Sequence, residues 1–238
     1  MAHGKRYRAA RELISDGTRY TIDDAVGLLK QTAKAKFDES VDVAFRLGVD
    51  PKQPDHMVRG ALSLPHGSGK TVRVLVFADG EAARDALEAG ADVVGGDELI
   101  NKVNDGFVDF DKAIAVRNLM AKVGRLGRVL GPRGLMPNPK TGSVVGPEQV
   151  AQAVREVKGG RIDFKVDKAG IVHVSIGKAS MEPNQLRDNL MAMAQQIMRL
   201  KPSSAKGIYV KSVALSTTMG PGVRIDPLEV VRVVTEMR

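Results

Sequence analysis

The stretch Thr71-Val72-Arg73-Val74-Leu75-Val76-Phe77 decides the fold of this 238-residue chain. It is an almost continuous apolar run, which is typical of a strand that is covered on both faces of a parallel sheet. Helical and strand-like patterns alternate after it: helices are predicted over residues 81–89, 97–103 and 147–157, and strands over 92–94 and 111–116. Alternation of this kind predicts βαβ units and a largely parallel sheet.

The sequence on both sides of this part has a different periodicity of apolar and polar residues. Apolar and polar residues alternate over 41–47, which predicts a half-buried strand, and the strand expected over 58–64 is interpreted as its neighbour. A hairpin is predicted from strands over 162–166 and 171–176, joined by the turn 167–170. Another strand is expected over 208–215, and helices from Thr21 onward and from Pro183 to Leu200. The outer parts therefore predict an α+β domain.

Two glycine-rich stretches, Gly67-Ser68-Gly69 and Gly159-Gly160, bracket the α/β part. We expect residues 1–66 plus 160–238 to form one discontinuous α+β domain, and residues 67–159 to form an α/β domain inserted into it. Glycines at both points where the chain passes between the domains allow a wide range of backbone conformations. We therefore also expect the two domains to move relative to each other.

The charge is basic, with 36 Lys and Arg against 28 Asp and Glu, a net charge of +8. The outer parts hold +7 of it. Within the insert, ten acidic residues and two basic ones lie between Asp79 and Asp111, whereas residues 117–140 hold six basic residues and no acidic one. A surplus of this size favours a polyanionic partner, although by itself it is weak evidence.

Several functions are disfavoured by the sequence. There is no cysteine, so disulfides, cysteine-bound metals and thiol nucleophiles are excluded, and the four histidines lack metal-ligand spacing. Gly67-Ser68-Gly69-Lys70-Thr71 resembles a phosphate-binding loop, but Leu64 stands where that motif needs glycine, and a strand rather than a helix is expected to follow. With no apolar run long enough to span a membrane and no signal-peptide core, we expect a cytoplasmic, non-enzymatic protein without metal or cofactor.

Three segments have the composition of RNA contacts. The segment 125–140, here called the basic segment, combines four basic residues with three prolines and three glycines. It should form no regular helix or central strand, and it suits either contact with phosphates or a rigid surface loop. Lys36-Phe37 pairs a cation with an aromatic ring that could stack on a base or plug the core. The run 216–221 offers hydroxyls and bare backbone, for ribose contacts or merely for a turn.

These residues belong to long motifs that resemble the bacterial L-one family of large-subunit ribosomal proteins. The motifs are G-R-L-G-R-V-L-G-P-R-G-L-M-P-N-P-K (124–140), T-T-M-G-P (217–221), K-F-D-E-S-V-D-V (36–43), V-R-G-A-L-S-L-P-H-G-S-G-K (58–70) and G-G-R-I-D-F-K-V-D-K-A-G (159–170). The similarity extends from about Lys5 to Ile225. Residues 226–238 resemble an extension, with a pattern that suits a short amphipathic helix or strand and no function that we can assign.

The resemblance implies a split RNA-binding domain formed by both termini and an inserted Rossmann-like domain. It also implies a monomer within the ribosome that binds large-subunit rRNA, forms the mobile stalk near the tRNA exit site, aids release of deacylated tRNA and represses translation of its own operon mRNA. The implied RNA contacts are Lys36, Phe37, Asp167, Lys168, Thr218, Met219 and Gly220. Weaker candidates beside them are Arg161, Lys165, Ser216 and Thr217, and a second RNA contact is expected at Arg125, Arg128, Arg133 and Lys140.

Two other functions remain open from the residues alone. The central α/β part could carry a nucleotide-dependent enzyme, because folds of this type host many activities. A basic chain could also bind duplex DNA, although no recognition-helix signature is evident.

Overall fold

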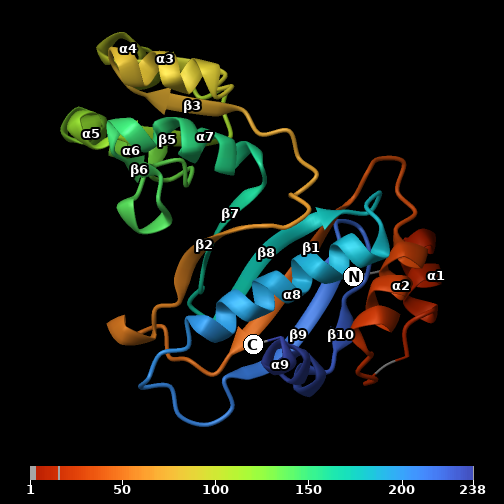
Figure 1. Cartoon of the computed structure of the whole chain (residues 1–238). Coiled ribbons are helices and arrows are strands. Elements are labelled where there is room, and N and C mark those ends of the chain that lie inside the picture. Colours follow the sequence, from red (N-terminus) through yellow and green to blue (C-terminus); the bar gives the residue numbers. More distant parts are fainter. Residues whose placement is uncertain (1–3, 16, 238) are drawn as a thin grey trace. The chain divides into compact units, whose positions relative to one another are not determined.

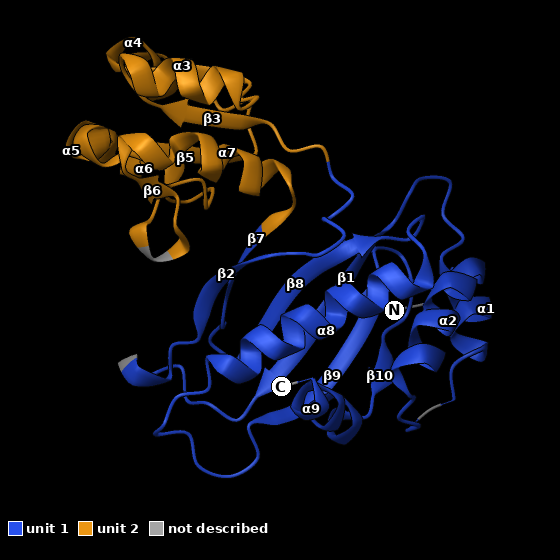
Figure 2. Ribbon diagram, viewed as in Figure 1, with its two compact units in different colours: residues 1–70, 162–238 blue, residues 71–161 orange. Residues whose placement is uncertain are grey.

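The computed structural model describes residues 4–15 and 17–237, without the side chains of Pro54 and Lys140. The chain forms two compact units (Figures 1 and 2): unit 1 contains residues 1–70 and 162–238, and unit 2 contains residues 71–161. These boundaries lie within four residues of the glycine stretches. Each unit is a mixture of helices and strands, as the sequence predicts.

Unit 1 is built on an antiparallel sheet of order β10-β9-β1-β8. Its strands are β1 (Ser40–Leu47), β8 (Ile171–Lys178), β9 (Val210–Thr217) and β10 (Val223–Ile225). The alternation predicted for residues 41–47 is confirmed: Val41, Val43 and Phe45 are each 1% exposed, while the residues between them are only partly buried. One face of the sheet therefore carries the core, and the other is open.

Helices cover the core face of this sheet. They are α2 (Ile22–Thr32), α8 (Pro183–Arg199) and α9 (Pro227–Glu236), and their apolar residues share one buried cluster with β1, β8 and β9. Helix α2 begins at the predicted cap, where the Thr21 hydroxyl accepts a hydrogen bond from the Asp24 N–H at 3.2 Å. A helix that the sequence analysis did not predict, α1 (Lys5–Glu12), lies at the N-terminus.

A second, two-stranded sheet in unit 1 pairs β2 (Arg59–Ser63) with β7 (Arg161–Lys165). The prediction that residues 58–64 lie beside residues 41–47 is therefore wrong, because β8 and β9 occupy both edges of β1. The predicted hairpin is also wrong for most of its length. Strand β7 ends at Lys165 and pairs with β2, and among the described residues only an isolated bridge between Val166 and Val172 joins the two predicted strands.

The glycine stretch at residues 67–69 is anchored rather than free. Asn189 of α8 is fully buried, and its side chain accepts from the His66 N–H at 3.1 Å and donates to the Gly67 carbonyl at 2.9 Å. Gly69 has φ +66°, and a Cβ there would lie 2.9 Å from Cγ of Lys178. This loop opens no helix, as its departure from the phosphate-binding pattern predicts.

Unit 2 has a parallel sheet of order β4-β3-β5-β6, with strands β3 (Val74–Phe77), β4 (Val93–Gly95), β5 (Lys112–Val116) and β6 (Val144–Val145). The prediction from the opening stretch is confirmed for Val74–Phe77, which are all fully buried, whereas residues 71–73 precede the strand. Helices α3 (Glu81–Glu88) and α7 (Val150–Lys158) pack on one face. Helices α4 (Asp97–Asn104), α5 (Met120–Val123) and α6 (Gly127–Leu130) pack on the other.

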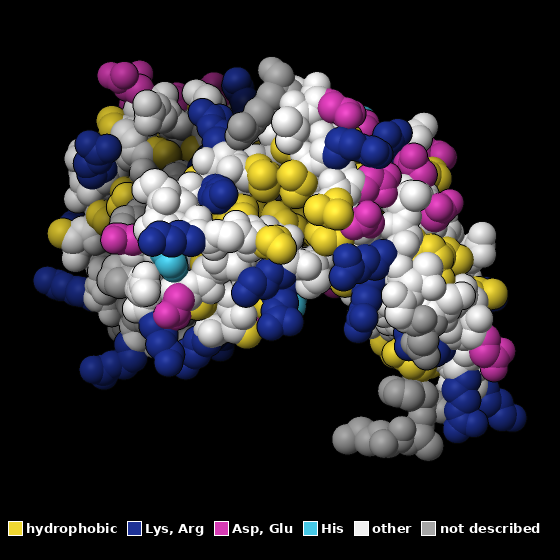
Figure 3. All heavy atoms as spheres, turned by 90° about the horizontal axis from the view of Figure 1, so that it is seen from below, with side chains coloured by type: hydrophobic (Ala, Val, Ile, Leu, Met, Phe, Trp, Pro, Cys, Tyr) yellow, Lys and Arg dark blue, Asp and Glu magenta, His cyan; other side chains and the backbone are white. Residues whose placement is uncertain are grey.

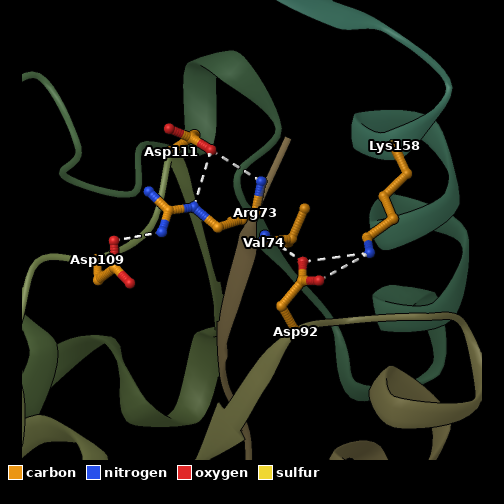
Figure 4. Close-up of polar contacts among 6 residues, drawn as sticks. All are labelled: Arg73, Val74, Asp92, Asp109, Asp111 and Lys158. Atoms are coloured by element: carbon orange, nitrogen blue, oxygen red, sulfur yellow. Dashed lines mark hydrogen bonds and ion pairs between the residues drawn. The ribbon is translucent and has the colours of Figure 1, made fainter. Parts of the chain in front are cut away.

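Polar contacts fix the beginning of this sheet (Figure 4). The Asp92 carboxylate accepts from the Val74 N–H at 2.7 Å and pairs with Nζ of Lys158 at 3.2 Å. Arg73 pairs with Asp109, and the Arg73 N–H donates to Asp111 at 2.9 Å. Hydrogen bonding from the Val74 N–H is the main reason why the pKa of Asp92 lies below its usual value. These contacts tie the chain entering unit 2 to the start of β5 and the end of α7.

Candidate nucleic-acid interface

Two segments distant in sequence meet where β1 begins and β9 ends. The Thr218 hydroxyl accepts from the Ser40 N–H at 3.0 Å, and the Thr218 N–H donates to the Ser40 carbonyl at 3.1 Å. These bonds join residues 178 positions apart and bring Lys36-Phe37 to the same end of the sheet as the turn 217–220.

A buried carboxylate organises this junction. Glu39 is 2% exposed, and its side chain accepts from the Ala35 N–H at 3.0 Å and the Met219 N–H at 2.9 Å. Burial alone would raise the pKa of Glu39, but hydrogen bonds from the Met219 and Ala35 N–H groups, together with the nearby Thr217 hydroxyl and Arg6 charge, hold it below its usual value. Glu39 therefore carries its charge in the folded protein and fixes the backbone on both sides.

The side chains around Glu39 are presented to solvent. Phe37 is 55% exposed and Met219 is 63% exposed, while Lys36 and Thr218 are also exposed. The interpretation of Phe37 as a core plug is therefore wrong. Large apolar side chains that stay exposed beside a cation, on a backbone held by hydrogen bonds, are suited to pack on a partner.

Gly220 is needed at the junction for space. A Cβ at this position would lie 2.3 Å from Oγ1 of Thr217, a residue that is 3% exposed. The Gly220 N–H also donates to the Thr217 carbonyl at 3.2 Å, which closes the turn. Of the candidates in this turn, Thr217 is thus a buried support, whereas Thr218 and Met219 form the surface.

Asp167 and Lys168 lie at the other end of the sheet. Arg46 pairs with Ile171 where β8 begins, and Ser40 pairs with Lys178 where it ends, so about 20 Å of strand separates the two groups. Asp167 accepts from the N–H groups of Ala169 and Ile171, both at 2.8 Å, and the bond from Ile171 is the main reason why its pKa is lowered. Asp167 thus shapes a turn that leaves Lys168 exposed.

The open face of the sheet connects these two groups. Ser175, Asp42 and Ser216 lie side by side across β8, β1 and β9, and His173, Ala44 and Ala214 form the next row. These residues point away from the buried face and are small or polar. The structure thus places a surface of small and polar side chains between the two candidate contact groups, and Ser216 belongs to it.

The remaining candidates do not join this surface as a group. The guanidinium of Arg161 pairs with Glu156 at 2.5 Å and donates to the Thr141 carbonyl at 2.7 Å, so it is committed within unit 2. Lys165 is exposed on β7.

The basic segment is partly helical, unlike the sequence expectation. It contains the end of a 3-10 turn over Gly124–Leu126 and the four residues of α6, and Leu126 and Leu130 of this part are at most 1% exposed. Short helical turns form because buried leucines at positions 126 and 130 hold them against the sheet, before Gly131 and Pro132. Arg125, Arg128 and Arg133 are exposed, and the Lys140 side chain lies outside the described residues.

Sequence reasoning missed one basic element near the junction. Lys5, Arg6 and Tyr7 of α1 line a pocket together with Lys34, Glu39 and Met219. The run Lys5-Arg6-Tyr7-Arg8 places one aromatic residue among three cations, and this composition was the signal that could have identified it.

Metal coordination finds no ready site in the parts of the chain that the structure describes. No group of three His, Asp or Glu side chains gathers there as metal ligands. Within the same residues, every helix is too short or too polar to cross a membrane.

Comparisons with known proteins agree with this picture. The family model of the Ribosomal protein L1p/L10e family matches residues 29–221. The Large ribosomal subunit protein uL1 of Maridesulfovibrio salexigens is 58% identical over 229 residues, which cover 95% of each chain. The proteins of the same name from Solidesulfovibrio magneticus and Clavibacter michiganensis subsp. michiganensis are 56% and 57% identical over 94% and 95% of this chain, and over 94% and 98% of their own. The chain therefore belongs to the Ribosomal protein L1p/L10e family, and it is a non-enzymatic protein of the large ribosomal subunit.

Proposed function

We propose that unit 1 binds large-subunit rRNA through the surface that runs from Lys36, Phe37, Thr218 and Met219, across the open sheet face, to Lys168. The observation that carries the proposal is the exposure of Phe37 and Met219 on a backbone that Glu39 and Ser40 hold by hydrogen bonds. A surface that is ordered before binding loses little conformational entropy when RNA contacts it.

The chemistry of this surface favours recognition by shape and ribose contacts. Hydroxyls, bare backbone and exposed apolar side chains suit ribose 2′-OH groups and base faces, whereas cations supply a smaller part of the surface. The dependence of the dissociation constant on salt should therefore be shallow, because only a few phosphates, such as those near Lys36 and Lys168, contribute to the slope.

Substitution of Phe37 by Ala tests the proposal directly. Because the ring is more than half exposed, its loss should leave the free energy of unfolding nearly unchanged. Affinity for the rRNA in filter binding should fall by about 1–3 kcal/mol if the ring stacks on RNA. Phe107→Ala, which removes an exposed ring of unit 2, is the matched control and should leave rRNA affinity unchanged. Equal affinity of both variants would contradict the proposed interface.

We further propose that the protein acts in the mobile stalk beside the tRNA exit site and aids release of deacylated tRNA. The exposed side chains Arg125, Arg128 and Arg133 of unit 2 support a second, separate RNA contact. Their charges suit a phosphate backbone, which gives affinity without base specificity.

The same unit 1 surface is proposed to repress translation of the protein's own operon by binding a similar site in its mRNA. One surface with two RNA ligands predicts that they compete. Unlabelled operon mRNA should displace labelled rRNA fully, and Phe37→Ala should weaken both. Simultaneous binding of the two RNAs would show that the mRNA, if it binds, uses another surface.

A further inference from the structure

A pocket of about 370 Å3 opens between α1 and the junction around Glu39. Helix α1 contributes Lys5, Arg6, Tyr7 and Ala10 to its wall, the segment after α2 contributes Lys34 and Ala35, and Met219 borders it from the turn at the end of β9. Three chain segments that are far apart in sequence thus enclose one space.

The wall of the pocket combines charged and apolar side chains. Lys5, Arg6 and Lys34 are exposed cations, and Arg6 also donates to the Lys34 carbonyl at 3.4 Å. Tyr7 is half-buried, Ala10 is 6% exposed and Met219 offers an exposed thioether. The only carboxylate in the wall among the described residues is Glu39, and its two oxygens already accept backbone hydrogen bonds. The net charge of the wall is therefore positive.

This combination has the features of a nucleotide subsite. The volume lies within the range of small-molecule pockets, and an aromatic ring beside cations is the arrangement that holds an unstacked base and its phosphate. Met219 and Glu39 belong both to the pocket and to the proposed interface, so a nucleotide in the pocket would be continuous with RNA on that surface.

We propose that this pocket receives one unpaired nucleotide of the bound RNA. The base packs on Tyr7 and Met219, and the phosphate lies among Lys5, Arg6 and Lys34. The inference rests on the proposed binding of rRNA by unit 1. It assigns to α1 a direct part in RNA recognition.

Base removal in the RNA, combined with substitution of Tyr7, tests the subsite. Full-length protein is titrated in filter binding against an rRNA fragment that contains its binding site, and against the same fragment with single abasic nucleotides placed one at a time in its unpaired positions. Tyr7→Ala should weaken binding of the intact RNA by about 5- to 100-fold, and Tyr7→Phe, which keeps the ring, should restore most of the affinity. At one position the abasic RNA should bind Tyr7→Ala and the natural protein with nearly equal affinity.

Charge controls separate the subsite from general electrostatics. Lys5→Gln with Arg6→Gln should lower affinity more than Arg199→Gln with Arg232→Gln, which removes the same charge from exposed residues of α8 and α9 on the helix-covered side of the sheet. The subsite is refuted if the losses of binding free energy caused by Tyr7→Ala and by base removal are additive at every position tested. It is also refuted if the two pairs of charge substitutions lower the affinity equally. If the natural protein fails to bind the rRNA at all, the proposed function itself is wrong.

Discussion

Gly220 shows how a single residue controls the candidate interface. Ala at this position would place a Cβ 2.3 Å from Oγ1 of Thr217, which is buried. Overpacking of this kind typically costs about 1–3 kcal/mol. We therefore expect Gly220→Ala to lower the free energy of unfolding by that amount, measured by urea denaturation, and to weaken rRNA binding.

Gly222→Ala is the matched control for this prediction. Gly222 lies two residues away and has an ordinary backbone conformation, and a Cβ at this position would have no neighbouring atom within 4 Å. Its substitution should change stability by less than about 0.5 kcal/mol. If the two variants were equally stable, the close approach of Gly220 to Thr217 would have no energetic consequence.

Glu39 makes the stability of the junction depend on pH. Its pKa in the folded protein lies below the usual value, so the unfolded state binds the proton more tightly and the ionised folded state is favoured at neutral pH. This contribution is complete above the usual glutamate pKa of about 4.3 and is lost as the pH falls through the lower folded value.

Glu39→Gln should remove this dependence. The amide keeps one acceptor but turns a donor toward a backbone N–H, which should cost about 1–3 kcal/mol at pH 7. Unfolding free energies measured from pH 7 to pH 3 should show a constant difference between the natural protein and the variant above about pH 5 and a shrinking one below about pH 4. A difference that stays constant down to pH 3 would contradict the role of the ionised carboxylate.

At the scale of elements, the C-terminal segment turns out to be structural. Residues 227–236 form α9, and Val230 and Val234 are each 1% exposed within the main cluster of unit 1. Asp226 caps the start of the helix, and its side chain accepts from the Leu228 N–H at 3.1 Å. Part of what the sequence marks as an extension without a function therefore closes the core.

Truncation after Asp226 tests this assignment. Burial of one valine side chain contributes about 1.5–3 kcal/mol, so loss of α9 should lower the free energy of unfolding by at least about 3 kcal/mol and reduce the melting temperature measured by circular dichroism. Deletion of residues 237 and 238 alone is the control and should have little effect, because Met237 is 57% exposed. A truncated protein as stable as the full chain would show that α9 adds nothing to the core.

For the whole molecule, the distribution of charge matters more than its total. The face in Figure 3 carries Lys and Arg in several separate groups around an area of hydrophobic side chains, rather than in one continuous patch. Within unit 2, Lys122 pairs with Asp97 at 2.7 Å and Lys158 pairs with Asp92, whereas Arg125, Arg128 and Arg133 remain exposed. Internal ion pairs thus engage some of the basic residues of unit 2 and leave the basic segment available.

The two proposed RNA contacts should be separable at this scale. Replacement of Arg125, Arg128 and Arg133 by Gln should leave the affinity of the isolated protein for rRNA within about twofold, because these residues belong to unit 2. The same variant should slow tRNA release in reconstituted ribosomes, measured by the departure of fluorescent deacylated tRNA. A large loss in the rRNA titration would place the basic segment in the primary site instead.

The sequence by itself determined the secondary structure of most of the chain and the division into an α+β and an α/β part. Local chemistry decides these features: residues 74–77 are apolar throughout because β3 is covered on both faces, and residues 41–47 alternate because one face of β1 is open. The composition of Lys36-Phe37 and of residues 217–220 also marked both segments of the junction.

Only the tertiary structure decided which strands pair and which candidates meet. Strand β1 pairs with β8 and β9 rather than with β2, and such long-range pairing depends on the packing of helices that follow much later in the chain. The same topology places Phe37 and Met219 at the same end of the sheet, sends Lys168 to the far end, and adds Tyr7 from α1. Contacts between residues up to 180 positions apart leave no local signal in the sequence, because their energy arises only when the chain has folded.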